Sequence, residues 1–124
     1  MTKALVVDDS RAMRLILSKT LRDLGFDVSQ AANGREALEA MDREGASFSL
    51  VLVDWNMPEL SGLDVVRSLR AQPVFDRVPV MMVTTETEIE QMVRALEAGA
   101  NEYIMKPFTR EVVEDKLRLL GVIQ

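Results

Sequence analysis

The stretch LVLVD, residues 50–54, decides the fold, because four branched apolar residues end abruptly at a carboxylate. Three other apolar runs end in the same way: Ala4–Val7 before Asp8-Asp9, Val80–Val83 before Thr84-Thr85, and Tyr103–Met105 before Lys106. Short runs of this kind, separated by amphipathic helical stretches, are typical of buried parallel strands. The sequence therefore predicts an α/β protein built on a parallel sheet.

The polar residues that follow these runs are expected to meet. Parallel strands all point the same way, so residues after their C-terminal ends gather at one edge of the sheet. In open α/β sheets that edge is where ligands bind. The predicted site contains three carboxylates, a hydroxyl and an ammonium group, from Asp8, Asp9, Asp54, Thr84 and Lys106.

The chain alternates strand and helix five times without a linker or repeat. The strands are expected at residues 3–8, 27–31, 49–54, 79–84 and 102–105. Glycine just past the end of four of the five predicted helices indicates a left-handed residue there, at Gly25, Gly45, Gly99 and Gly121. Residues 1–124 are expected to form a single domain, with no output domain.

Two strand orders suit five βα units with right-handed crossovers. The order 2-1-3-4-5 makes the first and third strands neighbours, and so places Asp8 and Asp9 beside Asp54. The order 3-2-1-4-5 separates those strands. The chemistry of the strand ends selects 2-1-3-4-5, a flavodoxin-like αβα arrangement in three layers. The second strand alternates polar and apolar residues, which suits an edge.

The helices have apolar faces that are expected to pack on the sheet. The first carries Met13, Ile16, Leu17, Leu21 and Leu24 on one side. The helix after the fourth strand is expected to begin with a capping box, Thr87 and Glu90. It should turn four apolar residues inward, namely Ile89, Met92, Val93 and Leu96.

The composition excludes several kinds of chemistry. The 124 residues include no cysteine and no histidine, so thiol nucleophiles, thiolate metal sites and Ser-His-Asp catalysis are absent. The net charge of −5 argues against a nucleic-acid partner. No apolar stretch is long enough to span a bilayer and no signal peptide is recognisable, so a cytoplasmic protein with no membrane partner is expected.

Three carboxylates at one place need a cation. At an effective dielectric constant of about 20, a pair of charges roughly 4 Å apart repel by about 4 kcal/mol. Oxygen ligands without nitrogen or sulfur suit a hard divalent ion, and Mg²⁺ more than Ca²⁺. Asp54 is the best candidate for a nucleophile toward a phosphoryl group, with Lys106 and Thr84 stabilising the charge. The simpler alternative is that Asp8-Asp9 only cap the first helix.

At these residues the chain resembles the receiver domains of bacterial two-component response regulators. Asp8-Asp9, Asp54, Thr84 and Lys106-Pro107 match the signature positions of that family in order and spacing, and the resemblance covers the whole chain. Within the family, the chemotaxis (CheY) branch is the most similar. That similarity is carried by residues 54–58, 83–84, 86, 103 and 106–108.

The resemblance implies a mechanism. A sensor histidine kinase of the CheA type would phosphorylate Asp54. Mg²⁺ would be held by Asp9, Asp54 and the backbone carbonyl of Asn56, with Asp8 acting through water. Lys106 would pair with a phosphoryl oxygen, and the Lys106–Pro107 peptide bond would be cis.

The resemblance also implies a switch and a partner surface. Thr84 and Tyr103 would change position on phosphorylation, while Asn56 and Glu86 would tune the lifetime of the phosphoryl group. The target would be a protein such as a flagellar motor switch protein, a phosphatase is possible, and a monomer is expected. Thr85 and Ser10 depart from the usual chemotaxis pattern, and the bulk of Thr85 is expected to oppose the inward position of Tyr103.

Other functions share parts of this chemistry. A phosphorelay shuttle or phosphate sink would use the same residues. An Asp-nucleophile phosphatase of the haloacid dehalogenase type needs a second aspartate two residues after the nucleophile, where this chain has Asn56. A constitutive pseudo-receiver that only binds partners is disfavoured, because every phosphotransfer position is filled. An enzyme acting on other substrates is therefore not expected.

Overall fold

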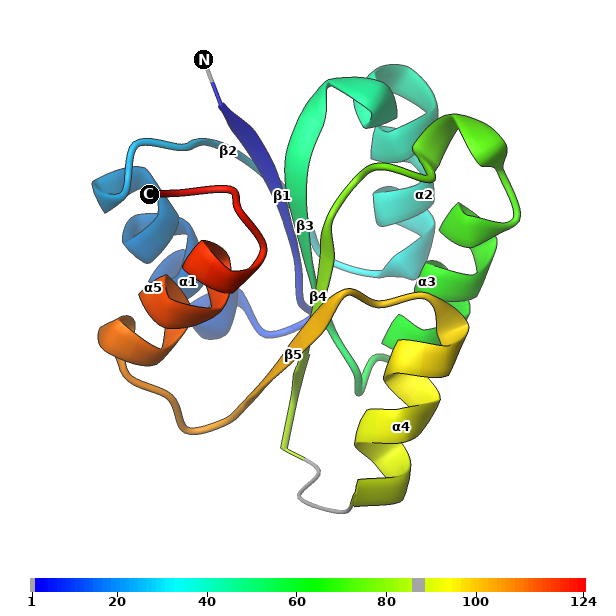
Figure 1. Cartoon of the computed structure of the whole chain (residues 1–124). Helices are drawn as coiled ribbons and strands as arrows, with labels where there is room; N and C mark the ends of the chain where they lie inside the picture. Colours follow the sequence, from blue (N-terminus) through cyan, green and yellow to red (C-terminus); the bar gives the residue numbers. More distant parts are fainter. Residues whose placement is uncertain (1, 86–88) are drawn as a thin grey trace.

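The structure is a computed structural model that describes residues 2–85 and 89–124. Its centre is a parallel sheet of five strands in the order β2-β1-β3-β4-β5, as the chemistry of the strand ends predicts (Figure 1). The strands are β1 Lys3–Val7, β2 Asp27–Ala31, β3 Phe48–Asp54, β4 Val80–Thr84 and β5 Glu102–Met105. The alternating strand, β2, lies at an edge, as expected.

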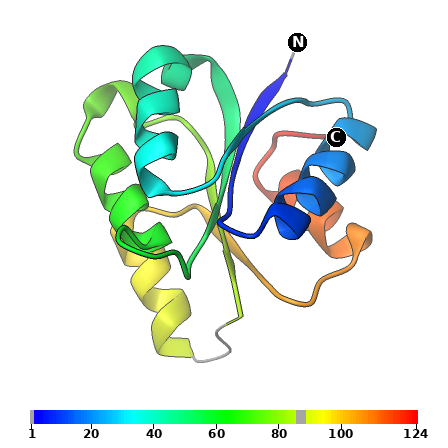
Figure 2. The ribbon, with the colours of Figure 1, turned by 180° about the vertical axis from the view of Figure 1, so that it is seen from behind.

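Helices cover both faces of the sheet. They are α1 Arg11–Asp23, α2 Gly34–Glu44, α3 Gly62–Arg70, α4 Ile89–Ala98 and α5 Arg110–Leu119. Figures 1 and 2 show α1 and α5 on one face and α2, α3 and α4 on the other. This is the predicted three-layer αβα arrangement. No helix of the described residues is long and apolar enough to cross a bilayer.

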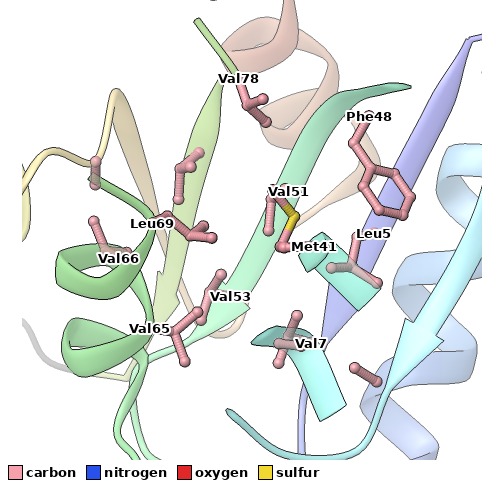
Figure 3. Close-up of a cluster of buried hydrophobic side chains, with 14 of the residues drawn as sticks. Leu5, Val7, Met41, Phe48, Val51, Val53, Val65, Val66, Leu69 and Val78 are labelled. Atoms are coloured by element: carbon pink, nitrogen blue, oxygen red, sulfur yellow. The ribbon is translucent and has the colours of Figure 1, made fainter. Parts of the chain in front are cut away.

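The core has two halves, one on each side of the sheet. Side chains along a strand alternate between the faces. In β3, Val51 and Val53 pack against α2 and α3 (Figure 3), while Leu50 and Leu52 pack toward α1 and α5. All four are completely buried. Burial on both faces explains why the central strands are continuous apolar runs and not alternating ones.

Helix ends follow the sequence signals with one exception. Gly25, Gly99 and Gly121 have positive φ angles of 97°, 116° and 76°, as predicted for residues that end helices. Gly45 follows the last residue of α2 as predicted, but the prediction of a left-handed backbone was wrong: its φ is −48°, and the chain continues into a 3-10 turn, η1 (Gly45–Ser47). A side chain at Gly45 would overlap the ring of Phe75, so this glycine allows close packing instead of a left-handed turn.

The prediction for the inward face of α4 was also largely wrong. Ile89, Val93 and Leu96 are 75%, 43% and 45% exposed, and we call these three residues the α4 outer face. Within α4, Ala95 is the one buried residue. The helix rests on the sheet through small side chains, so its apolar stripe is wider than its buried face. In the same way, Ile16 of α1 is 53% exposed, because α1 contacts the sheet through Leu17 and Leu21.

The edge of the sheet where the strands begin is held by Arg70. Its guanidinium donates to the carbonyl oxygens of Gly99, Phe75 and Val78 at 2.9, 2.7 and 2.9 Å, and to Asn101 Oδ1 at 2.8 Å. These bonds tie the end of α3 to the segments that lead into β4 and β5. Both chain termini lie toward this edge (Figure 1).

Candidate functional site

The opposite edge, where the strands end, brings the predicted polar residues together. Asp8 and Asp9 follow β1, Asp54 ends β3, Thr84 ends β4 and Lys106 follows β5. Carboxylate oxygens of the three aspartates all lie within 4.8 Å of one another. The adjacency of β1 and β3 produces this cluster, since Val7 is paired with Val53 and the next residues of the two strands are Asp8 and Asp54.

Asp8 is held by hydrogen bonds from all sides. Its side chain is fully buried. Ser10 N–H donates to Oδ1 at 2.8 Å, and Lys106 Nζ lies 3.4 Å from Oδ2. The Asp8 backbone N–H donates to the Ala31 carbonyl at 3.1 Å, and the Asp8 carbonyl accepts from Arg14 Nη1 at 2.7 Å. By contrast, the side chain of Asp9 is exposed.

Asp54 is buried at the end of β3, where the chain turns toward α3. It is 5% exposed, and its Oδ1 is 3.2 Å from Lys106 Nζ. The next residue continues the sheet, because Trp55 N–H donates to the Val83 carbonyl at 2.8 Å. Gly62 N–H then donates back to the Trp55 carbonyl at 3.0 Å. A side chain at Gly62 would overlap the carbonyl of Asp54, so α3 approaches this closely only because residue 62 is glycine.

The electrostatics of the cluster favour a cation. Burial is the largest cause that raises the pKa of the Asp54 carboxyl, and repulsion by Asp8 adds to it. Lys106 acts in the opposite direction through its charge and its hydrogen bond, and the Asn56 backbone also lowers the pKa by a hydrogen bond. The net direction is upward, so one ammonium group does not compensate for the neighbouring carboxylate and the loss of water.

The residues present fit a magnesium ion. The donors are carboxylate oxygens from three residues, two of them buried, and they converge within the distance that one ion can bridge. Hard oxygen donors in small number, open to solvent on the Asp9 side, match the preference of Mg²⁺ for a few protein ligands and several waters. The simpler alternative, in which Asp8-Asp9 cap α1, does not hold: the cap is Ser10, whose Oγ accepts from Met13 N–H at 3.2 Å.

The remaining predicted residues surround the cluster. Thr84 is 3% exposed, and its carbonyl accepts from Lys106 N–H at 2.7 Å. The Lys106–Pro107 peptide bond is cis, as the resemblance implies. Asn56 is exposed, and its Nδ2 lies 3.4 Å from Thr85 Oγ1, so the Thr85 hydroxyl faces the loop after β3. Glu86 and Thr87 lie outside the described residues.

Tyr103 is half-buried at the edge strand β5. Lys116 Nζ lies 4.8 Å from the centre of its ring, and the same ammonium pairs with Glu102 Oε1 at 3.0 Å. A groove between β5 and α5 continues from this ring, with Tyr103, Met105, Phe108, Val112 and Lys116 among its lining residues. This groove and the α4 outer face are apolar surfaces near Thr84 and Tyr103, the two residues expected to change position on phosphorylation.

Sequence reasoning missed Arg14. No motif marked it, yet it contacts the Asp8 backbone directly. One signal was present: Arg11 and Arg14 lie in the first turns of α1, which has no acidic residue in its first turn. Basic residues are disfavoured at the positive end of a helix dipole, but only Arg14 of the two has a hydrogen bond among the described residues, so the signal does not single it out.

Comparison with known proteins gives one consistent result. Residues 4–118 match the model of the response regulator receiver domain. The chain is 46% identical over 119 residues to the chemotaxis protein CheY1 of Helicobacter pylori strain J99, covering 95% of each chain. It is 40% identical over 116 residues to the chemotaxis protein CheY of Pseudomonas aeruginosa PAO1, covering 93% of this chain and 92% of the relative.

Solved structures give the same picture. Chemotaxis protein CheY4 of Vibrio cholerae has a TM-score of 0.89 and 38% identity, over 97% of this chain and 98% of that one. The receiver domain of a sensor histidine kinase from Pseudomonas aeruginosa PAO1 has a TM-score of 0.86 and 30% identity, again over 97% and 98%. That receiver domain was solved with a magnesium ion coordinated in its active-site cleft.

Proposed function

Because the chain belongs to the response regulator receiver family, we propose that residues 1–124 act as one receiver domain that is phosphorylated on Asp54. A sensor histidine kinase would donate the phosphoryl group, and the phosphorylated form would change its affinity for a protein target in chemotaxis. The observation that carries the proposal is the cluster of Asp8, Asp9 and buried Asp54 in contact with Lys106.

The acidic cluster would hold Mg²⁺. Asp9 and Asp54 would supply carboxylate oxygens, Asn56 its backbone carbonyl, and Asp8 would act through a bound water. When bound, Mg²⁺ neutralises charge on the oxygens of a transferring phosphoryl group. Asp8 is buried and held by Ser10 and Lys106, so it needs little rearrangement to keep its place in the site.

Phosphoryl transfer would use Asp54 as the nucleophile. An oxygen of its ionised carboxylate attacks the phosphorus of a phosphohistidine, the P–N bond breaks, and the departing imidazole takes the electron pair and a proton. The product is an acyl phosphate on Asp54. Lys106 lies 3.2 Å from Asp54 Oδ1, close enough for its ammonium group to reach an oxygen of the new phosphoryl group as a point charge.

The switch would run from Thr84 to the surface near Tyr103. A phosphoryl oxygen would attract the Thr84 hydroxyl, and the ring of Tyr103 would turn inward away from Lys116. That movement would reshape the β5–α5 groove and the α4 outer face, where a motor switch protein or another target would bind. A change from 1:99 to 99:1 in population needs about 5.5 kcal/mol of differential stabilisation.

The direct test is chemical modification followed by mass measurement. The purified protein is incubated with Mg²⁺ and acetyl phosphate, and intact mass is recorded for wild type and Asp54→Ala. We expect wild type alone to gain the mass of one phosphoryl group, and only when Mg²⁺ is present. An equal gain in Asp54→Ala, or none in wild type, contradicts the proposal.

A binding measurement then distinguishes the roles of the phosphorylated form. Tighter binding of a flagellar motor switch protein by the phosphorylated form supports the target-binding switch. Unchanged binding, with transfer of the phosphoryl group to a histidine on a second protein, indicates a phosphorelay shuttle instead. Thr84→Ala should phosphorylate but lose the affinity difference between the two forms.

A further inference from the structure

Arg14 holds the backbone that joins the buried and exposed aspartates. Its Nη1 donates to the Asp8 carbonyl oxygen at 2.7 Å. This carbonyl belongs to the peptide group between Asp8, which is fully buried, and Asp9, which is exposed. The carboxylate and the backbone N–H of Asp8 already have partners, so the bond from Arg14 fixes the last polar group of this residue.

The Asp9 side chain is oriented by the peptide group between Asp8 and Asp9. Its carboxylate forms no hydrogen bond or ion pair with the residues that the structure describes, although one of its oxygens lies within 4.8 Å of Asp8 and Asp54 oxygens. Because the Asp9 side chain has no such partner in the described part of the chain, the orientation of the Asp8–Asp9 peptide group sets the direction in which this side chain leaves the backbone. A rotation of this peptide group would move Asp9 away from Asp54.

We propose that Arg14 is a positioning residue for the cation site: by holding the Asp8 carbonyl, it aims the carboxylate of Asp9 toward Asp54. This inference rests on the proposed binding of Mg²⁺ at the cluster. The short bond from Arg14 to the Asp8 carbonyl supports it, because a guanidinium is charged and forms a stronger hydrogen bond than a neutral donor.

The charge of Arg14 and its positioning role have opposite effects on Mg²⁺ binding. A guanidinium close to a divalent cation repels it, so removing the charge alone would tighten binding. Removing the hydrogen bond would release the Asp8–Asp9 peptide group and weaken binding. The sign of the change therefore separates the two roles.

The experiment measures the dissociation constant of Mg²⁺ in three variants. Binding is followed by the fluorescence of Trp55, the single tryptophan, which directly follows Asp54. Partners that orient metal ligands typically change metal affinity 10- to 100-fold when removed, so we expect Arg14→Met to weaken binding about tenfold. Arg14→Lys keeps a charged N–H donor group and should recover most of the affinity.

Arg11→Met is the matched control. Arg11 lies in the same part of α1, carries the same charge, is exposed, and has no hydrogen bond or ion pair within the described part of the chain. We expect its loss to leave Mg²⁺ affinity unchanged or slightly tighter. Urea unfolding without Mg²⁺ checks that each variant is folded, and it also measures any purely structural effect of Arg14.

The outcomes separate cleanly. Affinity of Arg14→Met equal to or tighter than that of wild type overturns the positioning role, as does equal weakening in Arg11→Met. If Arg14→Met does not fold, Arg14→Ala, which also lacks a donor, replaces it: weaker binding supports the inference and unchanged binding overturns it. Failure of wild type to bind Mg²⁺ would instead refute the proposed function.

Discussion

Replacing Asp54 by asparagine should stabilise the protein without Mg²⁺ and leave it less stable than wild type with Mg²⁺. The change keeps the shape of the side chain and an oxygen that can accept from Lys106, but removes the charge. At an effective dielectric constant of about 20, the Asp8 carboxylate within 4.8 Å repels Asp54 by at least about 3 kcal/mol. On the same scale, Lys106 at 3.2 Å attracts it by about 5 kcal/mol.

Burial of the Asp54 carboxylate decides whether its ionised form is stabilised or destabilised in the folded protein. Loss of water around the 5% exposed Asp54 carboxylate is the largest influence on it, and together with the repulsion from Asp8 it raises the pKa despite Lys106. The ionised form is therefore destabilised in the folded state, and we expect Asp54→Asn to gain about 1 kcal/mol at neutral pH. With a urea m-value of roughly 1.5 kcal/mol per M, the unfolding midpoint should rise by about 0.7 M.

The pH dependence follows from the direction of the pKa shift. A carboxyl group whose pKa is raised in the folded state contributes stability that is fully present below the unfolded pKa, about 3.9, and is lost as the pH rises through the folded value. The advantage of Asp54→Asn should therefore be present at neutral pH and disappear as the pH falls. Both proteins are compared by urea denaturation in EDTA across this range.

Mg²⁺ should reverse the order of stability. At a concentration of 100 times its dissociation constant, a bound ligand stabilises the folded protein by about 2.7 kcal/mol. Wild type should gain this amount, while Asp54→Asn, which lacks one charged ligand, should gain much less. If wild type is the more stable protein in EDTA at neutral pH, the electrostatic reasoning about this site is wrong.

Three further substitutions test the fold. Arg70→Met should lower the free energy of unfolding by about 3 kcal/mol, because several carbonyl acceptors lose their donor; a loss below about 1 kcal/mol in urea denaturation would contradict this. Gly62→Ala should cost about 2 kcal/mol and weaken Mg²⁺ binding measured by titration, because the new methyl group overlaps the Asp54 carbonyl. Val93→Lys should change stability by less than about 0.5 kcal/mol, since this side chain is 43% exposed. A cost of several kcal/mol in thermal or urea unfolding would show that Val93 belongs to the core.

The sheet and the acidic cluster could be predicted from sequence because one physical requirement produces both. Strands buried on two faces must be apolar throughout, so the polar residue that ends each run marks the sheet edge. Asp54 at the end of β3 and Asp8-Asp9 after β1 are such residues, and their chemistry also selected the strand order. The cis peptide at Lys106–Pro107 came from family resemblance, since nothing in the local sequence requires it.

Two failures have a common physical cause, which is that packing between distant segments cannot be read from local periodicity. The apolar stripe of α4 predicted burial for Val93 and Leu96, but the helix contacts its neighbours through Ala95. Gly45 directly follows α2 as predicted, but its backbone is not left-handed, and the ring of Phe75 explains why a glycine is needed there. The bond from Arg14 to Asp8 joins residues close in sequence, but it depends on a rotamer that no motif specifies.

The placement of the chain ends has a practical consequence for reporters. Both termini lie toward the edge of the sheet where the strands begin, away from the acidic cluster (Figure 1). A fluorescent protein or affinity tag fused to either end would therefore project away from the phosphoryl donor. A tag at either end would therefore leave the acidic cluster accessible in measurements of partner docking in living cells.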